Sequence, residues 1–388
     1  MGHNGIAAVA GSEWVDMVNA PLRIVMTVAS LAPEFGGPAA KALAMAGAMR
    51  ACGHEVTLFG AGVSSVPGAT VLFGRLQYHH TIVPLALHRV FNAARKASIV
   101  HIFGVRDPLG IAAVLGARMG RVPCVLEPVG MKRPRGRNVR LKQLWDATVG
   151  RSLTGYASAF IATSRLEADE LRADGFDHSR IRVRPNGIEA TSREWTGTRG
   201  RLRRNLGVPD DASLVLFLGR LTRKKGVEAL LNSVAELADV HVLIAGPDGH
   251  DGTLQRIEAL RDSLGIAQRV HVLSRGLWRE DRAQAMADAD IFCLYSLSEN
   301  FGSAAAEAAA AGVATIVSDG CGVAEWLDAG VLTVPLADPV ALTTALQRLS
   351  TNVSMRTNLA SAGRRAACQL TWPAVAEQQV VFYRTLLP

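Results

Sequence analysis

Several features are absent from this 388-residue sequence, and each absence removes a class of protein. The five cysteines are scattered and contain no C-x-x-C spacing, which favours reduced, buried thiols in a cytoplasmic protein. No uninterrupted apolar run reaches the roughly 18 residues of a membrane span. The N-terminus carries Glu13 and Asp16 and has neither a basic nor a long apolar region, so we expect no secretory signal and interpret residues 1–20 as a flexible leader.

Length, composition and charge indicate a soluble protein of two domains. A chain of this length exceeds one core of ordinary size. Its composition, 49% hydrophobic and 20% charged, is typical of globular proteins. The formal net charge of +8 favours an anionic partner, and nucleic acid, an acidic membrane surface and a phosphorylated substrate all satisfy it.

Short apolar runs alternate with helical patterns along the chain, which predicts α/β architecture with parallel sheets covered on both faces. The alternation stops after "RPNGIE" and restarts beyond a polar stretch, so we place a domain boundary near residues 187–200. The predicted domains are 21–190 and 191–370, with a C-terminal helix at 371–388 that packs back on the N-terminal domain. The expected strands are 22–30, 54–60, 97–104, 121–128, 157–164 and 180–187, then 213–219, 240–246, 269–274, 288–296 and 313–319.

The stretch "FLGRLTRKKG" (217–226) crowds four cations into a loop between an expected strand and an expected helix. Basic side chains beside a helix N-terminus favour a diphosphate, because backbone N–H groups, the helix dipole and the cations all attract negative charge. A solvated basic loop is the alternative.

The stretch "SENFGSAAAEAAAAG" (298–312) places Glu307 among alanines on an expected helix that begins near Ser303. Glu307 is one position too late to close a capping box with Ser303. Small neighbours imply close packing, and an unpaired buried carboxylate costs several kcal/mol, which hydroxyl groups of a sugar or ribose would remove. Favourable placement near the helix start is the alternative explanation.

A loop glutamate and a helix glutamate eight residues apart, around "NFG", resemble the signature of retaining GT-B glycosyltransferases, glycosyltransferase family 4 in particular. The resemblance extends to "IATSRLEADEL", "IRVRPNGI" and "VSDGCGVAEWL" and covers residues 22–387. It implies two Rossmann-like doubly wound domains facing across a cleft. The implied activity is hexosyl transfer from a nucleotide diphosphate sugar, with no cofactor beyond the donor, no metal and no nucleic-acid partner.

The resemblance also implies roles for individual residues. Arg220 and Lys225 would bind the donor diphosphate, and Glu299 would hold hydroxyls of the transferred sugar. Glu307 would accept hydrogen bonds from the ribose. The remaining donor-binding residues that it implies are Gly36, Gly37, Gly219, Leu273, Asn300, Phe301, Gly302 and Ser303.

The acceptor side departs from the family pattern, since "CVLEPVGMKRP" lacks the histidine that many members carry there. Glu127 is the nearest titratable group, and a structural strand-end role is equally compatible with its position. Arg106 and Asp107 follow a strand and are further candidates for the acceptor side. "DADI" (288–291) has Asp-x-Asp spacing but is interpreted as the start of a buried strand, so no metal site is expected.

The run 132–145 carries six cations and no acid. It favours peripheral contact with an anionic membrane or a lipid-linked acceptor, and a solvated helix face is the alternative. Polysaccharide assembly in the cytoplasm, at the inner face of the membrane, is the expected setting. The sequence leaves the sugar, base, acceptor, general base and oligomeric state undefined.

Two other functions remain open at this point. A nucleotide-sugar 2-epimerase uses the same architecture but needs acid and base residues across the cleft that we cannot assign here. A non-catalytic sugar-nucleotide-binding protein would normally carry an export signal. A dinucleotide oxidoreductase is disfavoured because "EFGGPAA" does not fit G-x-G-x-x-G after the first strand.

Overall fold

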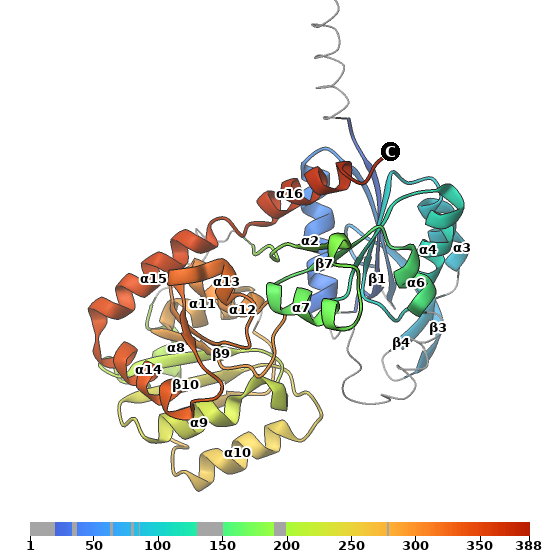
Figure 1. The fold of residues 1–388 in the computed structure, drawn as a ribbon. Coiled ribbons are helices and arrows are strands. Elements are labelled where there is room, and N and C mark those ends of the chain that lie inside the picture. The colour runs from blue at the N-terminus through green and yellow to red at the C-terminus, as the bar shows by residue number, and fades with distance from the viewer. Residues whose placement is uncertain are drawn as a thin grey trace, which may run out of the picture. The chain divides into compact units, whose positions relative to one another are not determined.

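The structure is a computed structural model that describes residues 20–32, 37–62, 65–78, 81–84, 86–129, 150–189, 199–277 and 279–388 (Figure 1). The chain divides into two compact units. The first unit holds the described residues up to Ala162, then Leu171–Gly187 and Trp372–Pro388. The second unit holds Thr163–Glu170 and Ile188–Thr371. No helix in the described part of the chain is long and apolar enough to cross a membrane.

The first unit is built on an eight-stranded sheet of order β4-β3-β2-β1-β5-β6-β7-β8, parallel except for the β3–β4 pair. The chain order reverses between β1 and β5. Five of its strands match expected ones, whereas β3 and β4 were not predicted and β8 is shorter than expected. The strands are β1 (Arg23–Ser30), β2 (Glu55–Gly62), β3 (Thr70–Tyr78), β4 (Thr81–Pro84), β5 (Ile99–Phe103), β6 (Cys124–Glu127), β7 (Ala159–Ala162) and β8 (Ile181–Val183).

Helices accompany this sheet as the alternating pattern predicts. Strands β5, β6 and β7 are buried along their whole length, as in a parallel sheet covered on both faces. The helices are α2 (Gly37–Ala51), α3 (Leu87–Ala94), α4 (Pro108–Gly120), α6 (Arg151–Tyr156) and α16 (Trp372–Arg384), with the 3-10 turn η3 (His178–Arg180). Helix α7 (Arg165–Ala173) is divided between the units, since its residues up to Glu170 belong to the second unit and the rest to the first.

The last helix, α16, belongs to the first unit and packs against α2. Val375, Ala376 and Tyr383 of α16 lie in the same apolar cluster as the core residues of β1 and α2. Gly187, just before the chain leaves this unit, has no room for a side chain because a Cβ there would overlap the ring of Trp372. Burial of one apolar face therefore fixes the C-terminal helix to the first sheet.

The second unit contains a six-stranded, wholly parallel sheet of order β11-β10-β9-β12-β13-β14. The chain runs outward from β9 through β10 to β11, then returns to the other side of β9 to build β12, β13 and β14. The strand order therefore reverses between β9 and β12. In open α/β sheets, ligands bind outside the carboxyl ends of the strands at such a reversal. The strands are β9 (Ser213–Leu218), β10 (Val240–Ala245), β11 (Val270–Leu273), β12 (Ile291–Leu294), β13 (Ala314–Ser318) and β14 (Leu332–Val334).

Strands β9, β10, β12 and β13 are buried throughout, so this sheet too is covered on both faces. Strand β14 was not predicted. The helices and turns of the unit are α8 (Arg201–Leu206), η4 (Arg223–Lys225), α9 (Val227–Ala235), α10 (Thr253–Ser263), α11 (Arg279–Asp288), α12 (Ser303–Ala311), α13 (Ala324–Leu327), η5 (Asp328–Gly330), α14 (Pro339–Thr351) and α15 (Val353–Ala367).

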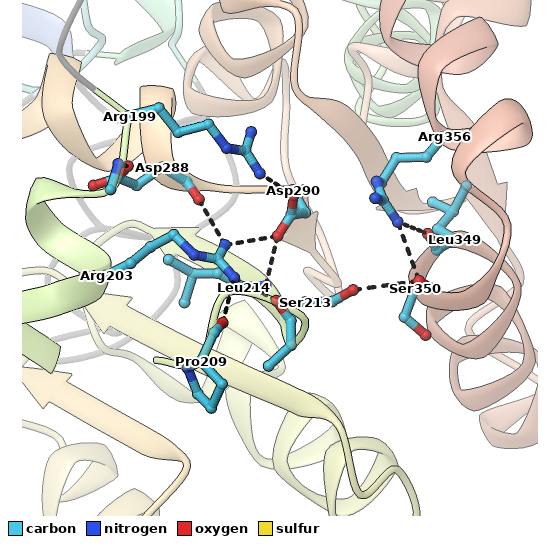
Figure 2. A network of polar contacts seen from close by, with 12 residues as sticks. Arg199, Arg203, Pro209, Ser213, Leu214, Asp288, Asp290, Leu349, Ser350 and Arg356 are labelled. Atoms are coloured by element: carbon cyan, nitrogen blue, oxygen red, sulfur yellow. Dashed lines mark hydrogen bonds and ion pairs between the residues drawn. The ribbon is translucent and has the colours of Figure 1, made fainter. Parts of the chain in front are cut away.

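A network of hydrogen bonds and ion pairs lies at the amino ends of β9 and β12 (Figure 2). Asp290, directly before β12, accepts hydrogen bonds from Arg199, from Arg203 at 2.9 Å and from the Leu214 N–H at 2.9 Å. The Asp288 carboxylate accepts the N–H groups of Gly200 and Leu202 at the start of α8. Both acids of "DADI" are thereby used to anchor α8 to the sheet, at the end opposite to the binding edge.

Candidate functional site

Two loops meet at the carboxyl ends of β9 and β12, where the strand order of the second sheet reverses. Lys225 ends the turn η4 after β9, and Glu299 follows β12. The Lys225 ammonium forms an ion pair with the Glu299 carboxylate, and 13% and 19% of these side chains remain exposed. Because the pair is reachable from solvent, an anionic or hydroxyl-bearing ligand can contact both charges.

Close backbone contacts hold these loops together. The Leu297 N–H donates to the Lys224 carbonyl at 2.8 Å, across the two loops. Gly226 has φ +64° and lies so near the Tyr295 carbonyl oxygen that a Cβ would overlap it. Only glycine accommodates this combination of left-handed backbone and close approach. The loop after β9 is therefore fixed against the end of β12 by main-chain packing.

The segment from Glu299 to Phe301 is fixed on its other side by the loop after β13. The Glu299 N–H donates to the Gly320 carbonyl at 2.8 Å, and the Gly322 and Val323 N–H groups donate to the Glu299 and Phe301 carbonyls at 2.9 and 2.7 Å. Phe301 is buried and anchors the segment in the core. The sequence "VSDGCGVAEWL" thus supplies the backbone partners that hold the predicted site loop in place.

Helix α12 begins at the end of this segment. Gly302 is its N-cap in left-handed geometry (φ 101°) and makes no side-chain cap hydrogen bond. Ser303 is the first helical residue, as predicted. The first-turn N–H groups and the positive end of the helix dipole lie beside Asn300 and Gly302, which is favourable for a bound anion.

Glu307 lies one turn further along α12, where it pairs with the Arg282 guanidinium of α11. The prediction that this carboxylate lacks a partner within the protein is therefore wrong. Burial raises the pKa of Glu307, and the neighbouring Glu189 adds to the increase, against the opposing effect of Arg282. The Arg282 Nε is buried without a hydrogen-bond partner. The Glu307 side chain keeps 22% of its surface exposed, so ligand hydroxyls can still reach it.

Other predicted donor residues lie along the same sheet edge. The Gly219 N–H donates to the Ala245 carbonyl and the Gly246 N–H to the Leu273 carbonyl, at 3.1 and 3.0 Å, so the ends of β9, β10 and β11 lie in a row. Gly246 lies so near the Gly219 carbonyl that a Cβ would overlap it. Arg220 is exposed on the loop after β9.

The structure describes one of the two donor glycines that the sequence predicts after β1. Gly37 is the first residue of α2, with open space where a Cβ would be. Gly36 lies outside the described residues, as does the basic run 132–145.

Glu127, the candidate base, is the centre of a buried charge cluster in the first unit. It pairs with Lys41 of α2 and with Arg184 at 2.7 Å, and contacts His101 Nε2 at 3.2 Å. His101 Nδ1 is hydrogen-bonded to the Tyr383 hydroxyl of α16. Burial would raise the pKa of Glu127, but Arg184 and Lys41 outweigh it and hold the pKa far below its usual range. These partners favour the structural reading of Glu127 over that of a proton acceptor.

Asp107 and Arg106 precede helix α4. Asp107 is its N-cap and accepts the Gly110 N–H at 2.8 Å. The carboxyl is almost fully buried, which raises its pKa to about 6. Arg106 is half-buried. Helix capping accounts for the position of Asp107, and the assignment of Asp107 and Arg106 to the acceptor side stays a prediction.

Within the described residues, no group of three or more His, Cys, Asp or Glu side chains is arranged to hold a metal ion. The carboxylates of Asp288 and Asp290, which have Asp-x-Asp spacing, accept hydrogen bonds from backbone N–H and guanidinium groups in the network of Figure 2.

Sequence reasoning missed the partners of the site residues. Arg282 lies 25 positions before Glu307 in a highly charged stretch, where no pattern distinguishes it. Lys41 and His101 can be recognised in the sequence, because each is the lone charged or titratable residue of an apolar segment. These segments are "AAKALAMAGAM" and "ASIVHIFG".

Two family profiles match the chain: "Glycosyl transferases group 1" at residues 198–366 and "Glycosyl transferase 4-like domain" at 36–187. The chain is 29% identical over 276 residues to the D-inositol 3-phosphate glycosyltransferase of Xylanimonas cellulosilytica, covering 68% of this chain and 64% of that protein. It is 26% identical over 428 residues to that of Acidothermus cellulolyticus, covering 99% and 94%. The matches to the Xylanimonas protein and to that of Corynebacterium jeikeium thus span less than two thirds of those relatives, 64% and 58%.

Solved structures share the fold. HepE of Anabaena, in complex with UDP and glucose, superposes with a TM-score of 0.75 at 18% identity, covering 94% of this chain and 99% of that one. Sucrose-phosphate synthase of Thermosynechococcus elongatus superposes with a TM-score of 0.72 at 21% identity, covering 94% and 98%.

These findings place the protein in the class of GT-B glycosyltransferases, with two Rossmann-like domains. Between them the two profiles match most of the chain. The chain belongs to the glycosyltransferases of group 1, of the family 4 type.

Proposed function

We propose that the protein transfers a hexose from a nucleotide diphosphate sugar with retention of anomeric configuration. The observation that carries the proposal is the meeting of Lys225 and Glu299 at the reversal of strand order, next to the N-terminus of α12. This arrangement offers positive charge to a diphosphate and a carboxylate to sugar hydroxyls within one rigid loop pair. The UDP in the Anabaena structure supports a nucleotide-sugar donor.

Positive charge at the diphosphate is the main chemical requirement of the reaction. Cleavage of the glycosidic bond leaves a nucleoside diphosphate and an oxocarbenium-like centre, so charge must be stabilised on the leaving group. Arg220 and Lys225 would supply two cations, and the first turn of α12 would add N–H donors. We therefore propose transfer without a metal ion. Each charge-assisted hydrogen bond contributes roughly 1.5–3 kcal/mol, so removing either cation lowers the rate on the order of tenfold or more.

The two carboxylates would bind hydroxyl groups. Glu299 is held by Lys225 and by backbone bonds to the loop after β13, and these contacts would orient it toward the donor. Glu307 would accept ribose hydroxyls on one oxygen while Arg282 stays on the other, where the guanidinium charge opposes the effect of burial on the pKa of the carboxyl.

Proton removal from the acceptor would fall to the donor itself. Glu127 is occupied by two cations and a histidine. In a retaining transfer the departing phosphate oxygen can take the acceptor proton, and we propose that route.

The acceptor would be a glycan, a lipid-linked or a small molecule. The name shared by the relatives makes a phosphorylated polyol the first small molecule to test. Membrane contact through 132–145 stays a prediction from sequence.

A turnover assay tests the proposal. The protein is incubated with UDP-, GDP- and ADP-sugars in EDTA, and release of nucleoside diphosphate is followed with and without candidate acceptors. We expect acceptor-stimulated release from one donor, lost in Glu307→Ala but not in Glu228→Ala, which removes a carboxylate paired with Arg256 on the surface of α9. The anomeric configuration of the product, read by NMR, tests retention.

Each competing function predicts a different result. Epimerised donor without transfer would favour a 2-epimerase. Saturable donor binding without turnover would favour a binding protein. Release that requires an added divalent ion would overturn the metal-independent step, and an inverted product would overturn retention.

A further inference from the structure

The outer surface of α3 and α4 in the first unit carries an apolar stripe with no partner in the described structure. Leu115 and Met119 are 53% and 64% exposed, and both appear among the few large hydrophobic residues at the protein surface. Ile111, half-buried, lies four residues before Leu115, so the three side chains share one line along α4. We call this line, with the cations that border it, the α4 face.

Helix α3 lies against α4 because two glycines of α4 leave room for it (Figure 1). A Cβ at Gly116 would overlap the carbonyl of Phe91, and one at Gly120 would overlap the carbonyl of Arg95. The C-terminal end of α3, with exposed Arg95 and Lys96, therefore adjoins the C-terminal end of α4.

Within residues 86–129, the exposed charged side chains have one sign. Residues 86–129 hold six Lys or Arg and two acids. Both acids, Asp107 and Glu127, are buried and already bonded within the first unit. Arg118 and Arg121, next to Met119, are exposed. The described part of the chain places no acidic side chain in an ion pair with either of them.

We propose that the α4 face binds an anionic lipid bilayer, with Leu115 and Met119 entering the boundary between headgroups and acyl chains. Proteins that bind at the membrane interface insert exposed apolar side chains and attract anionic lipids with neighbouring cations. A nucleic acid would use the cations alone and would leave the apolar stripe in water. The inference concerns attachment and does not depend on the identity of donor or acceptor.

Co-sedimentation with vesicles tests it. The full chain is mixed with two kinds of vesicle. One kind is phosphatidylcholine with about 30% phosphatidylglycerol, which supplies the anionic surface, and the other is phosphatidylcholine alone. We expect binding to the first and little to the second. Arg118→Gln with Arg121→Gln should weaken binding about 25-fold, since each cation near the surface contributes about fivefold.

The apolar stripe has its own variant and control. Leu115→Gln with Met119→Gln should weaken binding about tenfold or more. The matched variant Val340→Gln with Val353→Gln changes two residues of the second unit that are 70% and 61% exposed, and it should bind as the unchanged protein does. Circular dichroism of each variant verifies that it is folded.

Three outcomes would overturn the proposal. One is no difference between the two kinds of vesicle. Another is equal loss of binding in the α4 variants and in the matched variant. The third is binding to double-stranded DNA that competes with the vesicles and is unaffected by Leu115→Gln with Met119→Gln.

Discussion

Replacing Glu127 by glutamine should destabilise the first unit strongly. Glu127 compensates the charges of Lys41 and Arg184, whose side chains are only 7% and 4% exposed. Removing one member of a buried ion pair typically costs about 3–5 kcal/mol, because the other charge stays buried and unpaired. Two cations are left here, so we expect a cost of about 5 kcal/mol in the free energy of unfolding.

Urea unfolding followed by circular dichroism measures this cost, and hydrogen exchange locates it. Exchange should accelerate in α2, β6 and α16, which carry Lys41, Glu127 and Tyr383. Adding Lys41→Met to Glu127→Gln should restore part of the stability, because one uncompensated cation is removed. The control Glu258→Gln, an exposed residue of α10, should change little. A cost below about 1 kcal/mol for Glu127→Gln would refute the reasoning.

The pH dependence follows from the same cluster. The folded-state pKa of Glu127 is depressed below its ordinary value of 4.5. Its contribution to stability is therefore present above pH 4.5 and is lost as the pH falls through the folded-state pKa. Glu127→Gln should abolish that part of the acid dependence, and an unchanged acid profile would contradict this assignment.

Three further perturbations have defined outcomes. Because burial raises the pKa of Asp107 from 3.8 to about 6, the folded protein binds more protons than the unfolded chain between these values, and stability falls as pH rises through them. Asp107→Asn should keep the helix cap and remove this pH dependence, which amounts to about 3 kcal/mol in the free energy of unfolding. A free energy of unfolding that varies with pH as it does in the unchanged protein would contradict this. Asp290→Ala should lower the free energy of unfolding, measured by thermal unfolding, by about 3 kcal/mol, because the Arg203 guanidinium stays buried without its partner. A loss within about 0.5 kcal/mol, the size of an ordinary surface substitution, would count against this expectation. Gly226→Ala should both destabilise the second unit and lower turnover, because its Cβ meets the Tyr295 carbonyl, and unchanged turnover would show that the loop position is unimportant.

The fold was predictable wherever strands are buried throughout. Strands β5, β9 and β12 are short, largely apolar runs, and their length and their alternation with helical patterns identify them. Strands β3 and β4 form an antiparallel pair at a sheet edge, and β14 is a three-residue edge strand that is partly exposed. Edge strands need no continuous apolar run, so the pattern that revealed the others does not mark them.

The site was predictable where it depends on strand ends and not where it depends on tertiary partners. The positions of Lys225 and Glu299 follow from two strands that the sequence identifies, and the structure joins them in an ion pair. The pairing of Glu307 with Arg282 joins two helices whose contact no local pattern encodes. The cluster around Glu127 likewise combines side chains from separate segments of the first unit, so its role could not be read from its own strand.

A crystal structure with the nucleoside diphosphate released in the turnover assay tests the proposed donor site most directly. We predict the diphosphate against Arg220 and Lys225 at the carboxyl ends of β9 and β12, with the ribose hydroxyls on Glu307. A nucleotide bound elsewhere on the protein, with the Lys225–Glu299 and Arg282–Glu307 pairs untouched, would contradict it.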